Sequence, residues 1–397
     1  MMQPYLRKVN CEVCVVLVLV ISTTAVIFGY RTEGKNVAVI GEGAAGISSA
    51  LALIERDPSL NITIFYDVPF EKIVSYGPAG LFRIDTLENK VYGKRSFPRY
   101  AELFRKYGGE VSGVNLVSGH ILSTNLSELF LQDEIYGDIV YNFRYLREDE
   151  MKQFAEQNET DPVFAIHFTT YTTEGGKYIP WMKQQLLSKG VPFVKRHIKT
   201  VKDLYNDFDV IVNCAGLNGG KVASDGDDRN MFPIRGIILE VVKFIIDSFK
   251  FKFGFVNATW HKHFLYKGFE TFSIPTTDKV YIGSVKQAGR YDLEITEQDR
   301  SDILGRYYLL QPAIKNSTIL SEWSGLRPGR KGGVRLEMTT IRFPASKLRN
   351  ATHSKIVKIV HNYGHGGHGL SLSWGCAETV ADHILGSVNK NVRGGNR

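Results

Sequence analysis

Val37-Ala38-Val39-Ile40-Gly41-Glu42-Gly43-Ala44-Ala45-Gly46 is the stretch that decides the fold of this 397-residue chain. Four apolar residues run into a Gly-x-Gly-x-x-Gly motif, in which Ala44 and Ala45 stand between the last two glycines. In such a motif Gly41 permits a tight turn, Gly43 lets the backbone approach a pyrophosphate, and Gly46 allows a helix to pack closely on a strand. The amides that begin the helix also present their positive dipole end to phosphates. The motif therefore predicts a dinucleotide-binding turn.

The residues around the motif complete a βαβ unit. Residues 36–40 are predicted as a buried strand, residues 44–56 as a helix with one apolar face, and residues 61–66 as a second strand. Asp67 closes that second strand about twenty residues after the last glycine, the position from which an acid binds the ribose hydroxyl of a dinucleotide. The alternative for Asp67 is a turn or cap residue. The motif by itself does not distinguish FAD from NAD.

A second glycine-rich stretch, His361-Asn362-Tyr363-Gly364-His365-Gly366-Gly367-His368-Gly369-Leu370, lies near the other end of the chain. It stands between a predicted strand at residues 356–361 and a predicted helix at residues 373–385. A glycine loop of this kind closes over a flavin, so its pairing with the first motif favours a flavin oxidoreductase over a generic nucleotide binder. His365 and His368 have no third ligand at a suitable spacing, and no metal site is expected.

The remaining patterns indicate an α/β protein whose nucleotide domain is discontinuous. Strands predicted at residues 191–196 and 210–213 could return to the first sheet, whereas residues 234–242 and 272–283 have the spacing of antiparallel strands. We expect a Rossmann-like FAD-binding domain with an inserted, β-rich antiparallel substrate domain. Helices are predicted at residues 96–107, 178–189 and 297–310. The expected boundaries are 36–95, 178–225 and 350–390 for the FAD-binding domain, and 96–177 and 226–349 for the substrate domain.

The composition is that of an ordinary globular protein, with 43% hydrophobic and 23% charged residues. The formal net charge is +8, but the positive residues are scattered. Since long basic runs and recognition motifs are absent, a solvated basic surface is favoured over a nucleic-acid site, and it would attract an anionic substrate. Cys214 and Cys376 are the two cysteines after residue 30, and their apolar surroundings predict buried thiols.

The first 30 residues differ from the rest. Arg7 and Lys8 precede an apolar stretch over residues 13–28, the pattern of a secretory signal peptide. An uncleaved membrane anchor is the alternative, because the stretch is near the lower limit for a spanning helix. The sequence ends without a peroxisomal or retention signal, so we expect a secreted protein with no membrane segment after cleavage. The expected glycosylation sites are the sequons at Asn125, Asn158, Asn257, Asn316 and Asn350.

Beyond the leader, nearly all of the chain resembles the D-amino-acid oxidase and D-aspartate oxidase family, and most closely a secreted D-aspartate oxidase. The matching strings are residues 37–46, 78–81, 209–216, 325–328, 334–337, 361–370 and 374–377. The resemblance implies a FAD cofactor, with a D-amino acid, oxygen and water converted to a 2-oxo acid, ammonia and hydrogen peroxide. Hydride passes from the α-carbon to the flavin. The family's chemistry asks little of acids and bases, so no catalytic side chain is assigned and the protein supplies orientation and charge.

The resemblance also implies roles for single residues. Arg327 matches the arginine that binds the α-carboxylate, for which a guanidinium fork provides two parallel hydrogen bonds. Arg335 falls in a segment that runs beside the flavin ring, where its charge would stabilise the reduced flavin. The alternative for Arg335 is an ion pair with Glu337. Ser75 matches a hydroxyl residue near the flavin phosphates. The other expected flavin contacts are Gly80, Leu81, Gly364, His365, Gly366, Gly367, Gly369 and Leu370.

The chain departs from the family at Phe272. Family members have a tyrosine three residues before Pro275, and its hydroxyl helps to hold the substrate carboxylate. That hydrogen bond is missing here unless Tyr266 replaces it. Losing a bond to a charged group costs roughly 1.5–3 kcal/mol. We therefore expect weakened activity, although Arg327 remains.

Basic residues decide the expected substrate class. Lys267 and Lys286 flank the predicted strand that contains Phe272, and Arg290 and His263 lie further out on either side. These basic residues predict a preference for D-aspartate and D-glutamate. The alternatives are that these lysines point to solvent, as lysines usually do, and that neutral D-amino acids are preferred. Two other functions stay open. One is an NAD-linked dehydrogenase, which leaves the second glycine stretch unexplained. The other is a secreted flavin-binding protein with little or no turnover.

Overall fold

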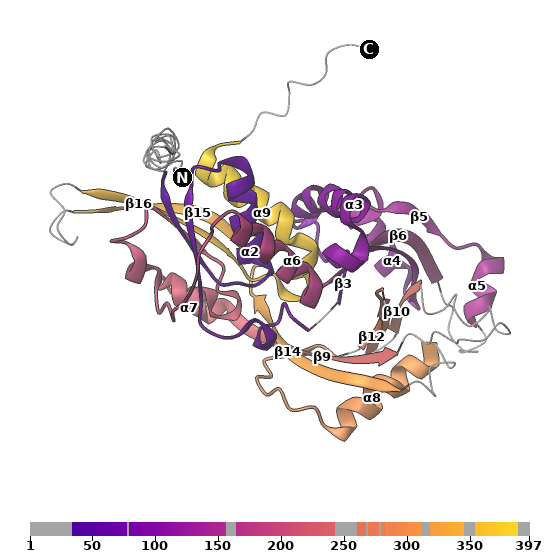
Figure 1. Ribbon diagram of the computed structural model, residues 1–397. Coiled ribbons are helices and arrows are strands. Elements are labelled where there is room, and N and C mark those ends of the chain that lie inside the picture. Colours follow the sequence, from indigo (N-terminus) through magenta and orange to yellow (C-terminus); the bar gives the residue numbers. More distant parts are fainter. Residues whose placement is uncertain are drawn as a thin grey trace, which may run out of the picture.

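Two β-sheets and the helices that cover them make up this computed structural model (Figure 1). A parallel sheet beside a separate, mainly antiparallel sheet confirms the predicted α/β fold class. The structure describes residues 34–77, 79–155, 164–242, 260–266, 269–277, 279–283, 285–310, 318–344 and 354–387.

The first sheet contains β1 (Asn36–Ile40), β2 (Asn61–Tyr66), β7 (Phe193–Lys195), β8 (Val210–Asn213), β15 (Arg335–Phe343) and β16 (Lys355–Tyr363). Their order across the sheet is β15-β16-β8-β1-β2-β7. All neighbours pair in parallel except β15, which runs antiparallel to β16 at the edge. The strands predicted at residues 191–196 and 210–213 therefore do return to this sheet. β1 is covered by a strand on each side, which explains its unbroken apolar sequence.

Helices from both ends of the chain cover this sheet. α2 (Ala44–Arg56) begins at the first glycine turn and packs against α9 (Gly369–Leu385) (Figure 1). α3 (Lys90–Ser112) also packs on α9, and α6 (Gly175–Ser188) packs on α2. α9 begins four residues before the helix predicted at 373–385. The end of the second glycine stretch is therefore the first turn of α9.

The second sheet contains β3 (Ala79–Leu81), β4 (Val114–Ser123), β5 (Tyr141–Tyr145), β6 (Phe164–Glu174), β9 (Met231–Val242), β10 (Trp260–Tyr266), β11 (Phe269–Pro275), β12 (Lys279–Gly283), β13 (Gln287–Ala288) and β14 (Ile319–Arg330). Its main order is β13-β9-β12-β11-β10-β4-β6-β3, with β14 paired to β9 and β5 to β6. Neighbours are antiparallel except β4 and β10, which pair in parallel. This parallel pair corrects the all-antiparallel expectation. It joins strands far apart in sequence, which no hairpin constrains.

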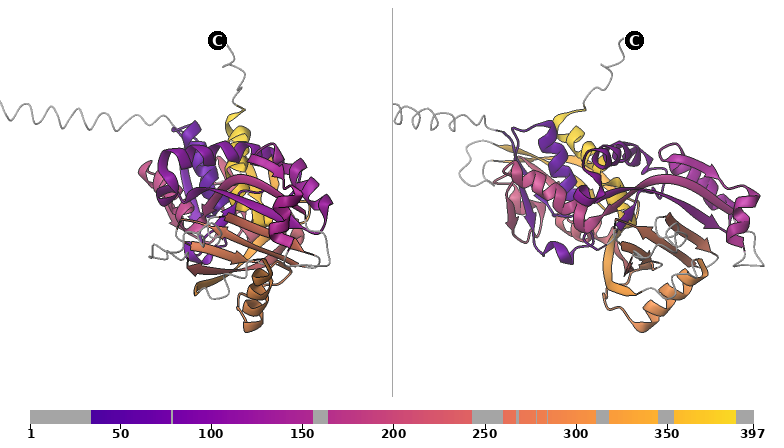
Figure 2. Two further views of the ribbon diagram at one scale, coloured as in Figure 1. Left: turned by 90° about the vertical axis from the view of Figure 1, so that its right-hand side faces the viewer. Right: turned by 45° about the vertical axis from the view of Figure 1, so that its right-hand side comes forward.

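α8 (Glu297–Leu310) packs on the second sheet, on the side away from α2 and α9 (Figure 2). Its Ile303 and Tyr307 are buried in a core cluster with Leu239 and Val280. Shorter helices are α4 (Leu126–Gln132), α5 (Glu148–Ala155) and α7 (Gly219–Ala223). Within the described ranges, no helix combines the length and apolar character needed to cross a bilayer.

Two strands lie in a different sheet from the one that their predicted domain implies. β3 falls within residues 36–95 but pairs with β6 in the second sheet. β15 falls within residues 226–349 but pairs with β16 in the first sheet. An open strand edge accepts any segment that the chain path brings beside it, and no local pattern encodes that choice. The pairings of residues 79–81 and 335–343 were therefore not predictable from the order of segments, and the expected domain boundaries stay a prediction.

Candidate functional site

A cavity of about 600 Å³ lies where the two sheets meet. Its walls come from the turns after β1, β2 and β7, from β3, β9, β11 and β14, and from the turn between β16 and α9. The size is that of a ligand pocket. Both glycine stretches therefore border one space, although they stand at opposite ends of the described chain.

The first glycine motif has the geometry that its sequence predicts. Gly41 has a φ of +107°, and a Cβ there would lie 2.5 Å from the carbonyl oxygen of Cys214. A Cβ on Gly46 would come within 1.9 Å of the Gly41 carbonyl oxygen, so this glycine lets α2 pack on β1 and does not line the cavity. The bare backbone at the start of α2 forms a turn suited to an anion. The motif residues that line the cavity are Gly41, Gly43, Ala44 and Ala45.

Two polar side chains stabilise this turn. Ser75 lines the cavity, and its Oγ accepts a hydrogen bond from the Ala44 amide at 3.1 Å. Glu42 is buried, and its Oε2 lies 2.7 Å from Nζ of Lys183. Sequence reasoning missed this ion pair because the two residues are 141 positions apart. Ser75 is thus beside the amides expected to meet phosphates.

The predicted ribose-binding acid lies at the cavity wall. Asp67 follows β2, and its Oδ2 is 3.0 Å from Nδ1 of His197. Arg196 and Lys199, which flank His197 closely in sequence, also line the cavity. Positive side chains in a cleft raise the local concentration of anions, which suits a phosphate-bearing cofactor.

The second glycine stretch turns the chain from β16 into α9. Gly364 and Gly366 have φ values of +87° and +54°, conformations that glycine adopts readily. Gly364 lies behind the cavity wall, where a Cβ would meet Arg330 at 2.9 Å. The start of α9 borders the cavity and brings its positive dipole end there. The predicted residues of this stretch that line the cavity are His365, Gly366, Gly367, Gly369 and Leu370.

The tight approach of β3 to α9 joins the two sheets at this point. A Cβ on Gly80 would come within 2.9 Å of the Leu370 Cβ. Gly80 and Leu81, which the resemblance predicts as flavin contacts, both line the cavity. A glycine is therefore needed where β3 passes the first turn of α9.

Two histidines of the second stretch occupy different surroundings. Burial lowers the pKa of His365 to about 4, and its Nε2 has no hydrogen-bond partner among the described residues. Nδ1 of His368 lies 3.1 Å from Asp85. Burial alone would raise the pKa of Asp85, but the neighbouring His368 and a hydrogen bond from Asn89 hold it well below its usual range. A bound ligand can supply the missing hydrogen-bond partner of such a buried nitrogen at a cavity wall.

Arg327 lies on β14, with its side chain against bare backbone on two sides. A Cβ on Gly236 would lie 2.3 Å from its Cζ, and one on Gly367 would lie 3.5 Å from its Cδ. Its Nη1 donates to the carbonyl oxygen of Val285 at 3.1 Å, and burial lowers the pKa of the guanidinium. The side chain lines the cavity beside the second glycine stretch. A cation in this desolvated position binds a carboxylate more strongly than one in water.

Alternate residues of β11 line the cavity, namely Glu270, Phe272 and Ile274. Nζ of Lys286, which also lines it, lies 2.8 Å from Oε2 of Glu270. Nη2 of Arg83 lies 3.9 Å from the other carboxylate oxygen. Sequence reasoning missed Glu270 and Arg83. The two-residue period along the strand, counted back from Phe272, would have indicated Glu270.

Arg335 does not take its predicted place beside the cavity. From β15 its Nη2 lies 2.7 Å from carboxylate oxygens of Asp225 and Glu337, and its Nη1 donates to the Tyr363 hydroxyl at 2.8 Å. The cavity lining includes Tyr363 but not Arg335. The alternative interpretation, an ion pair with Glu337, is therefore the one that the geometry supports. The prediction erred because Asp225, 110 residues away, draws the guanidinium elsewhere.

The structure describes only some of the other residues that were predicted to bind the substrate. Tyr266 ends β10, but its side chain lies outside the described residues, as does all of Lys267. Arg290 bonds to Asp292, with 2.6 Å between Nε and Oδ2, and does not line the cavity. Lys286 and Phe272 are thus the predicted side-chain neighbours of Arg327 that reach the cavity in the described part of the chain.

The predicted thiols and sequons are placed as follows. Cys214 and Cys376 are buried, and burial raises the pKa of Cys214 to about 12. Asn125 is exposed at the start of α4, where its side chain accepts a hydrogen bond from the Ser127 amide at 3.1 Å. Four predicted sequons lie outside the described residues, at Asn158, Asn257, Asn316 and Asn350.

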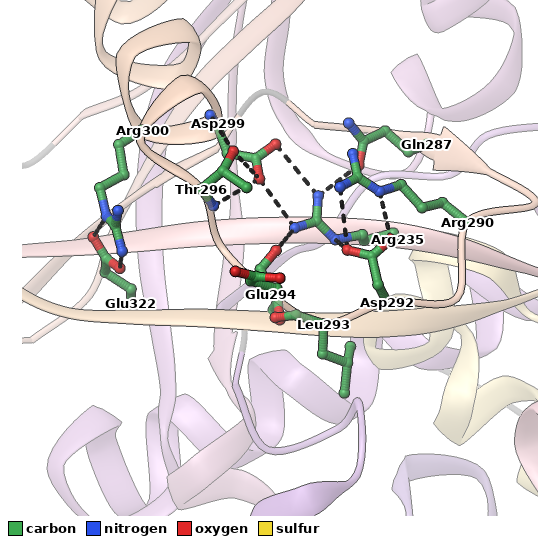
Figure 3. A network of polar contacts seen from close by, with 11 residues as sticks. Arg235, Gln287, Arg290, Asp292, Leu293, Glu294, Thr296, Asp299, Arg300 and Glu322 are labelled. Carbon is green, nitrogen blue, oxygen red and sulfur yellow. Dashed lines mark hydrogen bonds and ion pairs between the residues drawn. The ribbon is translucent and has the colours of Figure 1, made fainter.

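A buried arginine fixes the loop that completes one cavity wall (Figure 3). Arg235, on β9, is fully buried, and its Nη2 lies 3.1 Å from Asp299 in α8. It also donates to the Gln287 side chain at 2.6 Å and to the Glu294 carbonyl oxygen. Leu293, the neighbour of Glu294, lines the cavity. The network therefore holds residues 287–299 against the second sheet.

The chain is similar to known FAD enzymes over most of its length. The model of a family described as FAD-dependent oxidoreductase matches residues 36–383. D-aspartate oxidase 1 of Caenorhabditis elegans is 44% identical over 358 residues, which cover 90% of this chain and 98% of that protein. D-aspartate oxidase 2 of Caenorhabditis briggsae is 47% identical over 343 residues, covering 86% and 95%. Human D-aspartate oxidase is 29% identical over 358 residues, covering 88% and 94%.

Solved structures share the fold at lower identity. Glycine oxidase from Bacillus cereus aligns with a TM-score of 0.64 at 18% identity, covering 89% of this chain and 95% of that one. L-proline dehydrogenase from P. horikoshii aligns with a TM-score of 0.66 at 16% identity, covering 89% and 94%. The cavity between the sheets, with glycine turns at the starts of α2 and α9, fits a flavin dinucleotide.

Proposed function

Because the chain belongs to the family of FAD-dependent oxidoreductases that includes the D-aspartate oxidases, we propose that it oxidatively deaminates acidic D-amino acids. The products are a 2-oxo acid, ammonia and hydrogen peroxide, with oxygen as the electron acceptor. The observation that carries this proposal is that Arg327 and Lys286 line the same cavity as both glycine stretches. An acidic substrate has two carboxylates, and these are two cations to receive them.

Bound FAD supplies the acceptor for the hydride that leaves the α-carbon. The start of α2 would hold its phosphates, with Ser75 beside the Ala44 amide and Asp67 at the ribose. The start of α9 would place its positive dipole end near the ring, where negative charge is stabilised by helix amides. That role replaces the one expected of Arg335.

Arg327 would orient the substrate. Its guanidinium is held by the Val285 carbonyl and by close contact with the Gly236 backbone, so it is fixed before the substrate binds. Because the planar guanidinium donates two parallel hydrogen bonds to a carboxylate, it fixes the plane of the α-carboxylate. Orientation of this kind accounts for much of the rate when the cofactor carries the chemistry.

Lys286 would select the side chain of the substrate. It lies on the loop between β12 and β13, and its ammonium reaches the face of β11 that lines the cavity. A distal carboxylate there would meet a positive charge, whereas a neutral side chain would not. Phe272 lines the same region without a hydroxyl, so binding depends more heavily on the two cations.

Peroxide release by the FAD-supplemented chain, purified without residues 1–30, tests the proposal. D-Asp, D-Glu, D-Ala and their L-forms are compared, with the variants R327A and K286A and the control K331A, whose residue is exposed in the turn after β14. We expect turnover of the acidic D-forms, and loss in R327A but not in K331A. Preference for D-Ala would overturn the acidic selectivity. Flavin bound without peroxide from any substrate would favour a non-catalytic flavin-binding protein.

We also propose that the enzyme is exported, on the apolar stretch at residues 13–28 that follows Arg7 and Lys8. Peroxide would then form outside the cell, away from catalase. Expression of a tagged full chain in eukaryotic cells, followed by assay of the medium, tests this. Glycosylation at Asn125 should be lost in N125Q. Retention of the chain in peroxisomes or cytosol would contradict export.

A further inference from the structure

The cation proposed for the distal carboxylate already holds a carboxylate of the protein. Oε2 of Glu270 lies 2.8 Å from Nζ of Lys286, and Oε1 lies 3.9 Å from Nη2 of Arg83. Glu270 and Arg83 are largely buried, with side-chain exposures of 21% and 15%, whereas Lys286 is 54% exposed. All three line the cavity.

An acidic substrate must therefore compete with Glu270. Two carboxylates that approach one ammonium repel each other, and in a partly buried cavity this repulsion is screened less than in water. The bond between Glu270 and Lys286 is itself easily exchanged, because Lys286 is exposed and such ion pairs contribute little. A Glu270 carboxylate displaced from Lys286 would then be stabilised by a closer contact with a neighbouring cation.

We propose that Glu270 is an internal stand-in for the distal carboxylate of the substrate, and that Arg83 receives Glu270 when the substrate takes Lys286. This proposal rests on the proposed function. Arg83 is suited to that role because its guanidinium is already within 3.9 Å of Glu270, so a small side-chain movement would complete a hydrogen-bonded pair. Its backbone amide is bonded to Oγ of Ser371 at 3.4 Å, at the start of α9, which anchors it beside the cavity.

The exchange gives Arg83 and Glu270 opposite effects on selectivity. A neutral isostere of D-aspartate, D-asparagine, leaves the bond between Glu270 and Lys286 in place. D-aspartate breaks it. The ratio of kcat/KM for D-aspartate to that for D-asparagine therefore measures the exchange, while general loss of activity cancels between the two substrates.

A double-mutant cycle with R83Q, E270Q and the combined variant tests the proposal. We expect R83Q to lower the D-Asp to D-Asn ratio about ten-fold and E270Q to raise it about ten-fold, since like-charge repulsion of this size is ordinary for close pairs. In the E270Q background, R83Q should change the ratio less than about two-fold, because there is no carboxylate left to receive. E240Q, which alters a carboxylate paired with Lys279 outside the cavity, is the control.

Two results would overturn the proposal. An equal fall for R83Q in both backgrounds would mean that Arg83 binds the substrate directly. A lower or unchanged ratio in E270Q would mean that Glu270 does not compete with the substrate. The absorbance of bound flavin, measured on each variant, identifies misfolded protein and excludes it from the comparison. Failure of the proposed function is seen separately, as a wild-type enzyme that does not prefer D-aspartate to D-asparagine.

Discussion

The guanidinium of Arg327 lies so close to Gly236 that no side chain could be added there without moving it: a Cβ on Gly236 would stand 2.3 Å from Cζ. Gly236 pairs with Gly325 where β9 meets β14, and Arg327 is two residues further along β14. Bare backbone on β9 thus makes the space for Arg327, the cation that we propose to orient the substrate. The position of Arg327 therefore depends on a residue that has no side chain.

Substitution G236A should displace Arg327 and lower kcat/KM for D-aspartate by about 100-fold, since small displacements of an orienting group have effects of this order. Steady-state peroxide release measures the effect, and flavin absorbance should be unchanged. The matched control is G305A in α8, where a Cβ has nothing within 4 Å. Activity of G236A equal to that of G305A would show that the arginine tolerates the methyl group.

Substitution F272Y should supply the hydroxyl that the family resemblance predicts at this position. We expect KM for D-aspartate to fall by about ten-fold or more, because a hydrogen bond to a charged group contributes roughly 1.5–3 kcal/mol. F232Y is the control. The Phe232 ring lies against Gly329, as the Phe272 ring lies against Gly283, but Phe232 does not line the cavity. An unchanged KM would mean that the new hydroxyl is directed away from the substrate.

Substitution R335A should affect stability and not the cofactor. Asp225 and Glu337 are 40% and 55% exposed, but Arg335 is only 11% exposed and its Nη1 also lies 3.6 Å from the buried Asp227. We therefore expect a loss of about 1–3 kcal/mol in the free energy of unfolding. Urea denaturation measures that loss against R342A, an exposed arginine on the same strand. A shifted flavin absorbance spectrum in R335A alone would instead restore its predicted place beside the ring.

Substitution R235M, on β9, should be far more damaging than R290M, in the loop that Arg235 holds. Removing the fully buried Arg235 leaves the carboxylate of Asp299 without its cation, which costs about 3–5 kcal/mol. R290M breaks an exposed pair with Asp292, at about 0–1 kcal/mol. Urea denaturation compares the two. Adding D299N to R235M should recover part of the loss, and no recovery would contradict the assigned pairing.

Mild acid should destabilise the fold through His361 and His365. Burial lowers the pKa of each to about 4, below the value of about 6.5 in an unfolded chain. Between these values the unfolded chain binds protons that the folded chain does not, so the free energy of unfolding falls as pH falls. Urea midpoints from pH 7.5 to 4.5, without FAD, should decline, and less steeply in H365N. An identical slope in H365N would exclude His365 as a contributor.

Local patterns predicted the parts of the site that are continuous in sequence. The strand, turn and helix at residues 36–56 follow from spacing alone, because each glycine has a backbone role that no other residue performs as well. The second glycine stretch was found for the same reason. Arg327 was found because its neighbours in sequence resemble those of a known family.

The predictions that were wrong or missing concern contacts between residues far apart in the sequence. Arg335 was assigned from its neighbours in sequence, but Asp225 determines where its guanidinium lies. Glu270 and Arg83 come from different strands and meet only at the junction of the sheets. The parallel pairing of β4 with β10 also joins distant segments. Contacts of this kind are set by chain path and open strand edges, which local periodicity does not encode.

The turn after β1 and the first turn of α9 both line the cavity. In the first sheet, β16 lies between β8 and β15. A nascent chain whose residues 355–371 have not yet left the ribosome lacks both β16 and the cavity wall formed by the first turn of α9. Such a chain has no complete place for the cofactor, whatever its earlier segments have folded into. Flavin capture is therefore a late event in biosynthesis, and a chain cut short before α9 would be colourless.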